Sequence, residues 1–372
     1  NSRQPLIRLY NPTYAGKNSY NVLFTDSIIQ NLTTENFYNG QWQTCDSNSF
    51  KTMSAVAWYF GKELAENINI PVGLINISIG GAPIETFIGT EALKNSKQFA
   101  EKLNGNWLTN DALPVWIKER GNQNVGGLTN ITKDEYGNNH AFKPSFAYEA
   151  GISPILNLHI KGILCYQGES NAQEIERVKE YADLSALMVA DCRKKWRQPD
   201  LPFYFVQLSS IDTLKYKGQL WPQFRDEQRK MLSLIPNSGM AVCSDIGFKN
   251  DVHPTNKKDV GERLALWALN KTYHKNIIPS GPLPLTAKYL NGKVVVSFQY
   301  MAKGLKTSDA EPLNGFSLDG IHKSNAVIGD SGILIYTKEK PDYIYYGWQP
   351  FSEGNLVNSE GFPASTFKIK VK

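Results

Sequence analysis

The chain has 372 residues, of which 41% are hydrophobic and 20% charged, a balance typical of a soluble globular protein. The net charge is +5, because 40 Lys and Arg are scattered among 35 Asp and Glu. No basic run of the kind that follows a nucleic-acid backbone is present, and no apolar run reaches the roughly 18 residues of a membrane-spanning helix. We therefore expect neither a nucleic-acid partner nor a membrane span, and the charge favours an anionic substrate only weakly.

Four cysteines, Cys45, Cys165, Cys192 and Cys243, match no CxxC metal-binding spacing. Cys165 and Cys243 lie in apolar runs that resemble strands, so we expect buried free thiols, although the sequence leaves a disulfide open. The first residue is Asn1 rather than Met, which indicates a processed or trimmed chain. The lack of a signal peptide therefore does not indicate whether the protein is exported.

The larger, N-terminal part of the chain alternates between amphipathic helices and buried strands. Helical spacing of apolar residues predicts helices over residues 54–67, 174–196, 221–234 and 256–275. Short apolar runs between them predict strands over residues 72–79, 159–166, 203–208 and 239–244. Strands that alternate with helices build βαβ units, so we expect an α/β layer fold with a parallel sheet over residues 1–278.

The pattern changes at residues 278–284, where IPSGPLP interrupts any helix. The β-branched and aromatic runs KVVVSFQY, GILIYTK and YIYYGW follow, with turn signals such as Asn291-Gly292 between them. We therefore predict a small all-β domain over residues 279–372. Residues 86–143 form a long irregular stretch rich in Gly, Asn and Trp, and long loops of this kind often carry function.

The clearest chemical pattern follows the last strand of the α/β part. Asp251 and His253 are separated by one residue, and Pro254 precedes the next predicted helix. The carboxyl ends of the strands in an open α/β sheet are where ligands bind. An Asp can hold an imidazole in one tautomer, and the His can then take a proton from a hydroxyl nucleophile. The same triplet also fits a plain surface or capping feature.

Two further polar segments follow other predicted strands. In KGILCYQGESNA, the amides of Gln167 and Asn171 could donate to a developing oxyanion, although Ser170 or Asn171 could equally cap a helix. An earlier strand ends in Gly80-Gly81. Glycines there either let backbone N–H groups approach a ligand or simply form a tight turn.

Together these segments resemble a known family of enzymes. PVGLINISIGGAPIETF, GILCYQGESNA and DIGFKNDVHPTNKKDVGERLA are similar, in this order, to motif blocks of the sialate O-acetylesterase family of the SGNH hydrolase superfamily. IRLYNP, MSAVAWYFGKEL and the tail YYGWQPFSEGNLVNSEGFPASTF also resemble it, although the family usually has Trp where Cys165 stands. The resemblance spans nearly the whole chain. It implies an α/β, flavodoxin-like SGNH hydrolase three-layer fold with a small C-terminal all-β domain.

The resemblance assigns proton-transfer roles to residues near the end of the α/β part. His253 matches the general base of the family. Asp251 matches the carboxylate that orients this base, with Asp245 as the alternative. His253 and one of these two carboxylates would complete a Ser-His-Asp arrangement in which the imidazole takes the proton of a serine.

The resemblance also assigns the groups that would hold the oxyanion. Gly80 or Gly81 matches the backbone donor of the oxyanion hole, and Gln167 or Asn171 matches the amide that completes it. The sequence leaves the choice within each pair open. Glu169 matches a residue that supports these donors and does not itself transfer a proton.

The nucleophile of the family lies in a Gly-Gln-Ser-Asn-Met motif upstream of the part that resembles IRLYNP. Here IRLYNP begins at Ile7, and the motif is absent. Three explanations stay open: an N-terminal fragment of the same precursor carries the serine, Ser27 in NVLFTDSIIQ replaces it, or the chain binds glycans without turnover. Against Ser27, Thr25 stands where SGNH hydrolases have Gly.

The resemblance implies a carbohydrate O-acetylesterase, and in particular a sialate 9-O-acetylesterase, that transfers an acetyl group to water without a metal or an organic cofactor. The expected partner is an O-acetylated sugar or sialoglycan. Acetylated plant polysaccharides are an alternative substrate, and glycan binding without catalysis is an alternative function. The expected location is an exported compartment, which would be secreted, periplasmic or lysosomal in type.

Overall fold

The computed structural model describes residues 4–212 and 218–372. The chain divides into two compact units, which are described separately. The first unit contains Asn1–Ile163, Gln167–Pro202 and Leu234–Pro236, and the second contains Leu164–Tyr166, Phe203–Ser233 and Asn237–Lys372. The domain boundary predicted between residues 278 and 279 falls inside the second unit, so it stays a prediction.

Short strands and mostly short helices build the first unit. Its strands are β1 (Gln4–Tyr10), β2 (Thr13–Tyr14), β3 (Tyr38–Asn39), β4 (Trp42–Cys45), β5 (Val72–Ile75), β6 (Lys133–Asp134) and β7 (Gly137–Asn138). Its α-helices are α1 (Asp26–Ile29), α2 (Ser49–Thr52), α3 (Ala55–Ile68), α4 (Thr90–Lys94), α5 (Val115–Gly121) and α6 (Ile175–Trp196). Tighter or wider turns of helix are η1 (Ile84–Phe87), η2 (Ala100–Leu103), η3 (Asn122–Gly126), η4 (Tyr148–Ile152) and η5 (Ser153–Ile155).

The sheet of the first unit has the order β4-β1-β5. β1 runs antiparallel to β4 and parallel to β5. Within the described residues, β5 pairs with β1 alone and so lies at an edge of this sheet. Only Leu74 of its four residues is buried, whereas strands of parallel sheets are usually buried on both faces. The predicted strand over residues 72–79 is shorter because the Asn76 N–H makes its bond to Tyr10 O (2.8 Å) and the chain then leaves the ladder.

Helix α3 packs directly against this sheet. It begins after Ser54, whose side chain accepts a hydrogen bond from Ala57 N and caps the helix. A Cβ atom on Gly61 would lie only 2.6 Å from Leu74 Cδ1, so glycine allows α3 to approach β5 this closely. The predicted helix over residues 54–67 is therefore confirmed to within one residue at each end.

The second unit contains the remaining strands and helices. Its strands are β8 (Ile163–Cys165), β9 (Phe203–Gln207), β10 (Ser238–Val242), β11 (Leu283–Leu290), β12 (Lys293–Gln299), β13 (Leu305–Thr307), β14 (Phe316–Ser317), β15 (Ala326–Gly329), β16 (Gly332–Tyr336), β17 (Tyr343–Tyr346), β18 (Leu356–Asn358) and β19 (Phe367–Lys370). Its helical segments are η6 (Gly218–Leu220), α7 (Trp221–Leu234), η7 (Ser244–Ile246), α8 (Lys257–Trp267) and η8 (Ala268–Thr272). The boundaries of β8 and α7 extend by one residue into the first unit.

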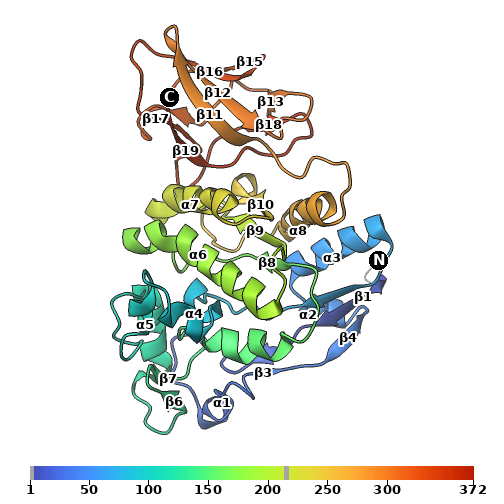
Figure 1. Ribbon diagram of the computed structural model, residues 1–372, viewed down its shortest axis with the longest axis vertical. Helices are drawn as coiled ribbons and strands as arrows, with labels where there is room; N and C mark the ends of the chain where they lie inside the picture. The colour runs from blue at the N-terminus through green and yellow to red at the C-terminus, as the bar shows by residue number, and fades with distance from the viewer. Residues whose placement is uncertain (1–3, 213–217) are drawn as a thin grey trace. The chain divides into compact units, whose positions relative to one another are not determined.

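The α/β part of the second unit contains a sheet of order β10-β9-β8, drawn side by side in Figure 1. β9 and β10 are parallel, and every residue of both strands is buried. β8 is only half-buried and three residues long, so the strand predicted over residues 159–166 is shorter than expected. No helix in residues 4–212 and 218–372 is both long and apolar enough to cross a bilayer.

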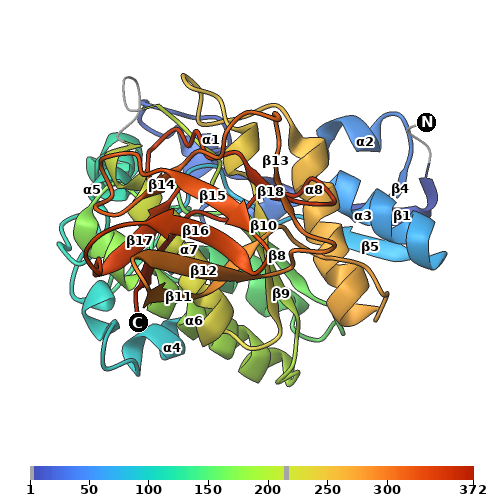
Figure 2. The ribbon, with the colours of Figure 1, turned by 90° about the horizontal axis from the view of Figure 1, so that it is seen from above.

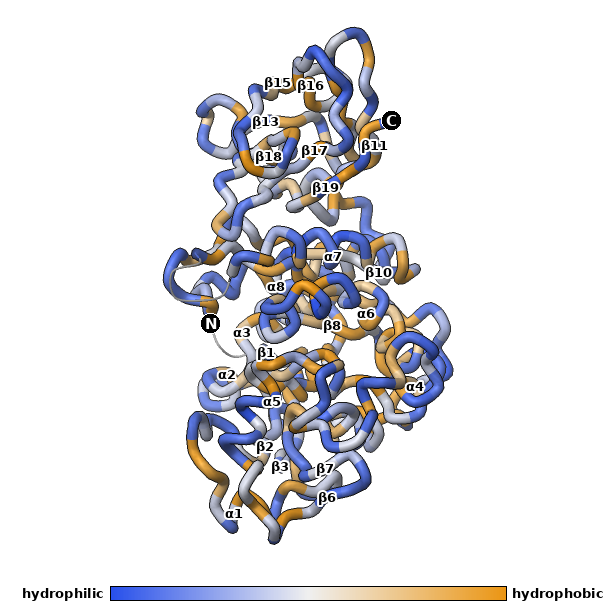
Figure 3. The backbone as a smooth tube through the Cα atoms, turned by 90° about the vertical axis from the view of Figure 1, so that its left-hand side faces the viewer, coloured by the Kyte–Doolittle hydropathy of each residue, from blue (hydrophilic) through white to orange (hydrophobic). Residues whose placement is uncertain are grey.

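The C-terminal part of the chain is built from antiparallel strands, as predicted. Its largest sheet has the order β11-β12-β16-β15, seen from above in Figure 2. Burial alternates along β12. The C-terminal strands contain hydrophobic segments, which are orange in Figure 3. Asn291 and Gly292 both have positive φ (50° and 75°) in the turn between β11 and β12, the hairpin geometry that the Asn-Gly pair predicts.

Buried polar side chains join these strands to the α/β part of the second unit. The Gln207 side chain, at the end of β9, accepts from Thr366 N (3.1 Å) and donates to Thr366 O (3.2 Å). Arg225 on α7 is fully buried and donates to Gly347 O (3.0 Å) and Pro350 O (3.3 Å). These bonds fix the C-terminal strands to β9 and α7 through the chain's own backbone carbonyls.

Candidate active site

The second unit holds the Asp-His pair that the sequence singles out. Asp251 follows β10 and η7 and forms an isolated β-bridge with Phe248. Its Oδ1 accepts a hydrogen bond from His253 N (2.8 Å) and lies 3.4 Å from His253 Nδ1. The side chains are 83% (His253) and 55% (Asp251) exposed. Because the carboxylate faces Nδ1, it favours the tautomer that leaves Nε2 free to accept a proton.

The alternative carboxylate, Asp245, is already paired. Arg263 on α8 donates to both of its oxygens, from Nη1 and Nη2, at 2.6 Å each. Arg263 also donates to Val242 O at the end of β10, so this pair ties α8 to the strand. A carboxylate held in this bidentate way is poorly placed to orient an imidazole, and the geometry favours Asp251 over Asp245 for that role.

The first unit holds the glycine turn. Gly81 has φ of +74°, a conformation that glycine adopts without strain, and both glycines are exposed. The N–H of Gly80 donates to Tyr14 Oη (3.3 Å), and partial burial raises the pKa of that phenol above its ordinary value. Ser170 Oγ donates to Gly81 O (2.6 Å), which fixes the orientation of the turn.

The two candidate amides lie behind this turn in the same unit. Asn171 is fully buried, and its Oδ1 accepts from Ile84 N (3.1 Å) and from Gln167 Nε2 (2.9 Å). Its Nδ2 donates to Glu85 Oε2 (2.9 Å), and Gln167 Oε1 accepts from Tyr181 Oη (2.6 Å). Both amides therefore hold the backbone that follows Gly81, and their role as oxyanion donors stays a prediction.

The comparisons with known proteins agree on one family. A family model described as a carbohydrate esterase, sialic acid-specific acetylesterase, matches residues 133–270. Curated sialate O-acetylesterases are similar to the chain: that of Pongo abelii is 28% identical over 306 residues, which cover 78% of this chain and 51% of the relative. The human enzyme is 29% identical over 268 residues, covering 68% and 45%.

A solved structure is similar along nearly the whole chain. The crystal structure of a carbohydrate acetylesterase from Xanthomonas citri superposes with a TM-score of 0.75 at 26% identity, covering 99% of this chain and 74% of that one. The chain is therefore similar to sialate O-acetylesterases and to a carbohydrate acetylesterase, and residues 133–270 match the model of that esterase family. It spans about half the length of the curated relatives it matches.

The other residues predicted from the family pattern lie in the first unit. Ser27 is exposed on α1, its Oγ is 3.1 Å from Thr25 Oγ1, and no strand precedes it within residues 21–25. This local structure differs from the strand-then-serine start of the SGNH hydrolases. Glu169 is half-buried beside the amides, and its backbone oxygen accepts from Gln173 Nε2 (3.5 Å).

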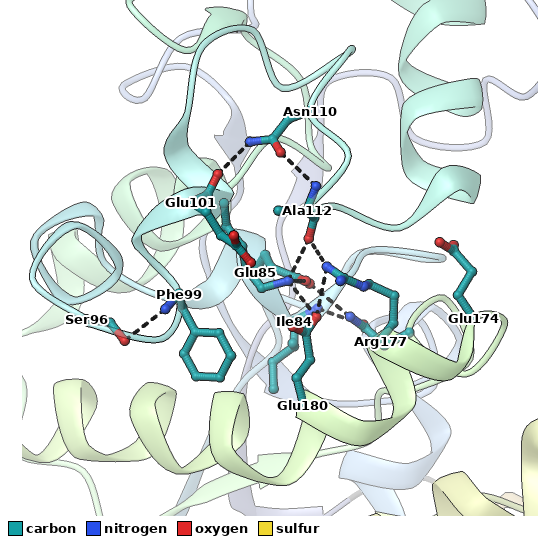
Figure 4. A network of polar contacts seen from close by, with 12 residues as sticks. Ile84, Glu85, Ser96, Phe99, Glu101, Asn110, Ala112, Glu174, Arg177 and Glu180 are labelled. Atoms are coloured by element: carbon teal, nitrogen blue, oxygen red, sulfur yellow. Dashed lines mark hydrogen bonds and ion pairs between the residues drawn. The ribbon is translucent and has the colours of Figure 1, made fainter.

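A buried ionic network joins Glu85, which follows the glycine turn, to the irregular stretch, and no pattern in the sequence predicts it (Figure 4). Lys102 Nζ contacts Glu85 Oε1 (3.0 Å) and Glu180 Oε1 (2.6 Å) and donates to Ala112 O (2.8 Å). Arg177 Nη1 lies 3.1 Å from the same Glu180 oxygen. Burial raises the pKa of Glu180 more than Lys102 and Arg177 lower it. Through Glu85, this network supports Asn171.

Within the described residues no disulfide joins the four cysteines, and Cys45, Cys192 and Cys243 are buried. Burial raises the pKa of the Cys243 thiol to about 12. Among residues 4–212 and 218–372, no group of three or more His, Cys, Asp or Glu side chains is placed to hold a metal ion.

Proposed function

We propose that this protein is a carbohydrate O-acetylesterase that acts on acetylated sialic acids by Ser-His-Asp acyl transfer to water. The observation that carries the proposal is the contact of Asp251 Oδ1 with His253 Nδ1, within the residues that match the sialic acid-specific acetylesterase model. An exported compartment, as expected from the resemblance, is part of the proposal.

In this proposal, a serine Oγ attacks the acetyl carbonyl while His253 Nε2 accepts the hydroxyl proton. The tetrahedral oxyanion is held by the backbone N–H of Gly81, or of Gly80 once it leaves Tyr14 Oη, together with Gln167 or Asn171, and the sugar hydroxyl leaves with the proton from His253. Water activated by the same imidazole then hydrolyses the acetyl-enzyme and releases acetate. Asp251 stabilises the imidazolium that forms in both steps.

We propose that the nucleophilic serine comes from an N-terminal fragment of the same precursor, on a strand that pairs with the open edge of β5. The support is that β5 has one partner in the described residues and three of its four residues are not fully buried. Neighbouring parallel strands end at the same edge of a sheet, so a residue that follows such a strand would lie beside Gly80 and Gly81.

The test is acetate release from 9-O-acetylated N-acetylneuraminic acid, with intact mass measured on the same denatured sample. A second, short polypeptide or a longer chain together with acetate release supports the precursor fragment. A single 41.8 kDa chain that releases acetate would return Ser27 to consideration. His253→Ala should lower turnover by at least about 10²-fold, as expected for loss of a general base. Unchanged turnover in this variant would contradict the assignment.

Two alternatives predict different results in the same assay. An esterase specific for acetylated plant polysaccharides would release acetate from acetylated xylan and leave acetylated sialic acid intact. A glycan-binding protein without catalysis would bind sugars saturably and release no acetate from either substrate.

A further inference from the structure

Aromatic side chains and a cation border the Gly80-Gly81 turn in the first unit. Helix α5 carries Trp116 and Arg120 on one face, because residues four apart in a helix are neighbours. The Cζ of Arg120 lies 4.7 Å from the ring centre of Trp116 and 5.5 Å from that of Tyr20. The guanidinium therefore contacts two rings that come from distant parts of the sequence.

Both of these rings also reach the glycine turn. Trp116 Nε1 donates to Gly81 O (3.4 Å), and a Cβ atom on Gly81 would lie 3.8 Å from the same indole. A Cβ atom on Gly80 would lie 3.6 Å from Tyr20 Oη. The side chains of Trp116 and Tyr20 therefore lie close both to the Arg120 guanidinium and to the glycine turn.

A second cation lies near the other phenol of the turn. Lys17 Nζ is 5.8 Å from the ring centre of Tyr14, whose hydroxyl accepts from Gly80 N. Positive charges around a site attract anionic ligands and raise their local concentration. The charges near the turn therefore favour an acidic substrate over a neutral one.

Arg120 has hydrogen-bonding capacity that the protein leaves unused. Its Nη1 donates to Asn21 Oδ1 (2.7 Å), whereas its Nε is buried and has no partner. Within the described ranges, no Asp or Glu carboxylate lies at ion-pair distance from this guanidinium. The buried Nε is closed to an external ligand, whereas neither Nη atom is among the buried unpaired atoms, so an external carboxylate can pair with the guanidinium through its Nη groups.

The loop that carries Tyr20 is held in place before any ligand binds. Asn124, in η3 directly after α5, is 1% exposed and donates to Val22 O (2.6 Å). Its own backbone oxygen accepts from Phe24 N (2.9 Å). A site whose walls are fixed in advance loses less entropy on binding, so these bonds favour ligand recognition.

We propose that Arg120, supported by Trp116 and Tyr20, binds the carboxylate of an acidic sugar whose acetyl ester lies at the Gly80-Gly81 turn. The inference rests on the proposed function and adds the residue that selects the substrate class. The acetyl group reaches the turn, the apolar face of the sugar packs on the rings, and the carboxylate pairs with the guanidinium. Neutral acetylated sugars lack the group that Arg120 would recognise.

The test compares two ligands that differ only at the carboxyl group, N-acetylneuraminic acid and its uncharged methyl ester, by direct calorimetric titration of the protein. A charge-assisted pair predicts that the acid binds about 10- to 100-fold more tightly than the ester. Added salt should weaken binding of the acid more than binding of the ester. Equal affinities for acid and ester would overturn the proposal.

Variants test whether Arg120 causes the preference for the acid over the methyl ester. Arg120→Gln should bind acid and ester equally, and Arg120→Lys should keep a reduced preference, because an ammonium cannot form the bidentate pair. Lys118→Gln is the matched control, since it removes a charge from the same helix whose present partner is Asp111 (2.9 Å), and its preference should be that of the unaltered protein. A preference that survives in Arg120→Gln, or is lost in Lys118→Gln, overturns the assignment.

Binding of the acid and the ester can be measured without turnover. The carboxylate site can therefore fail or succeed independently of the proposed esterase activity. A protein that prefers the acid but releases no acetate supports the carboxylate site and contradicts the esterase. A protein that releases acetate but binds acid and ester alike supports the esterase and contradicts the carboxylate site. The ligand pair is tested on the unaltered chain, so a variant that fails to fold does not remove the test.

Discussion

Replacement of Lys102 by Met tests the buried network behind the glycine turn. The side chains of Lys102 and Glu85 are fully buried, and Lys102 also contacts Glu180 at 2.6 Å. Methionine has similar length without the charge, so Lys102→Met leaves a buried carboxylate without its cation. Breaking a buried ion pair in this way costs about 3–5 kcal/mol. We expect the free energy of unfolding, measured by urea denaturation at pH 7.5, to fall by that amount.

The loss should depend on pH in a defined direction. Burial raises the folded-state pKa of Glu180 above the ordinary value of 4.5, so the native state binds its proton more readily than the unfolded state. Its contribution to stability is therefore full below pH 4.5 and declines as the pH rises through the folded pKa. Lys102 lowers this pKa, so its removal should raise the pKa further. The cost of Lys102→Met should accordingly be smaller at pH 4.5 than at pH 7.5.

The control is Lys118→Met, which removes a cation paired with the fully exposed Asp111. An exposed pair is worth at most about 1 kcal/mol, so this variant should be nearly neutral. In the double variant Glu85→Gln/Lys102→Met, the loss should be less than the sum of the single losses, because the two side chains interact directly. A loss for Lys102→Met below about 1 kcal/mol, or one equal at both pH values, would refute a stabilising ionic network.

Three further outcomes are expected. Arg225→Leu removes the hydrogen bonds of the guanidinium to Gly347 O, Gln349 O and Pro350 O. At about 1 kcal/mol for each lost bond the urea midpoint should fall markedly, and an unchanged midpoint would contradict a stabilising role for these bonds. Iodoacetamide at pH 8 should label Cys243 only after denaturation, because burial raises its pKa to about 12; peptide mass mapping of native protein would expose an error. Asp251→Asn should lower kcat by at least about 10²-fold with little change in KM, and an unchanged kcat would favour another carboxylate.

The helices were the most predictable part of the fold. Helix α7 occupies the predicted residues 221–234, and α6 begins one residue after its predicted start. Both follow from side-chain spacing within the segment itself, which the sequence records directly. The helix predicted over residues 256–275 is shorter as an α-helix, since α8 ends at Trp267 and continues as the wider turn η8.

Strand lengths were predicted less well because a strand exists only where a partner accepts its hydrogen bonds. The apolar run over residues 72–79 indicates burial, but β5 extends only as far as β1 runs beside it. β9 and β10 have full parallel ladders with each other, and there the prediction holds to within two residues. Hydrophobic runs therefore report burial, and the pairing must come from the fold.

In the candidate site, local contacts could be predicted from the sequence, whereas contacts between distant residues could not. Asp251 and His253 are two residues apart, so their contact is local and could be inferred from the triplet. Lys102 is 17 residues from Glu85 and 78 from Glu180, and neither spacing suggests a pair. Arg120 lies 99 residues from Asn21, and no pattern in the sequence joins them. Contacts of this range depend on how the irregular stretch folds.

The bonds of Gln207 and Arg225 to the C-terminal strands also bear on how such a chain can change during evolution. A recombination event that exchanged residues 279–372 for an unrelated β-fold would remove the backbone partners that both side chains have in the C-terminal strands and loops. A buried amide and a buried guanidinium would then face an apolar or mismatched surface. The C-terminal strands are thus expected to be inherited together with β9 and α7, and to diverge in step with them rather than to be shuffled as an independent module.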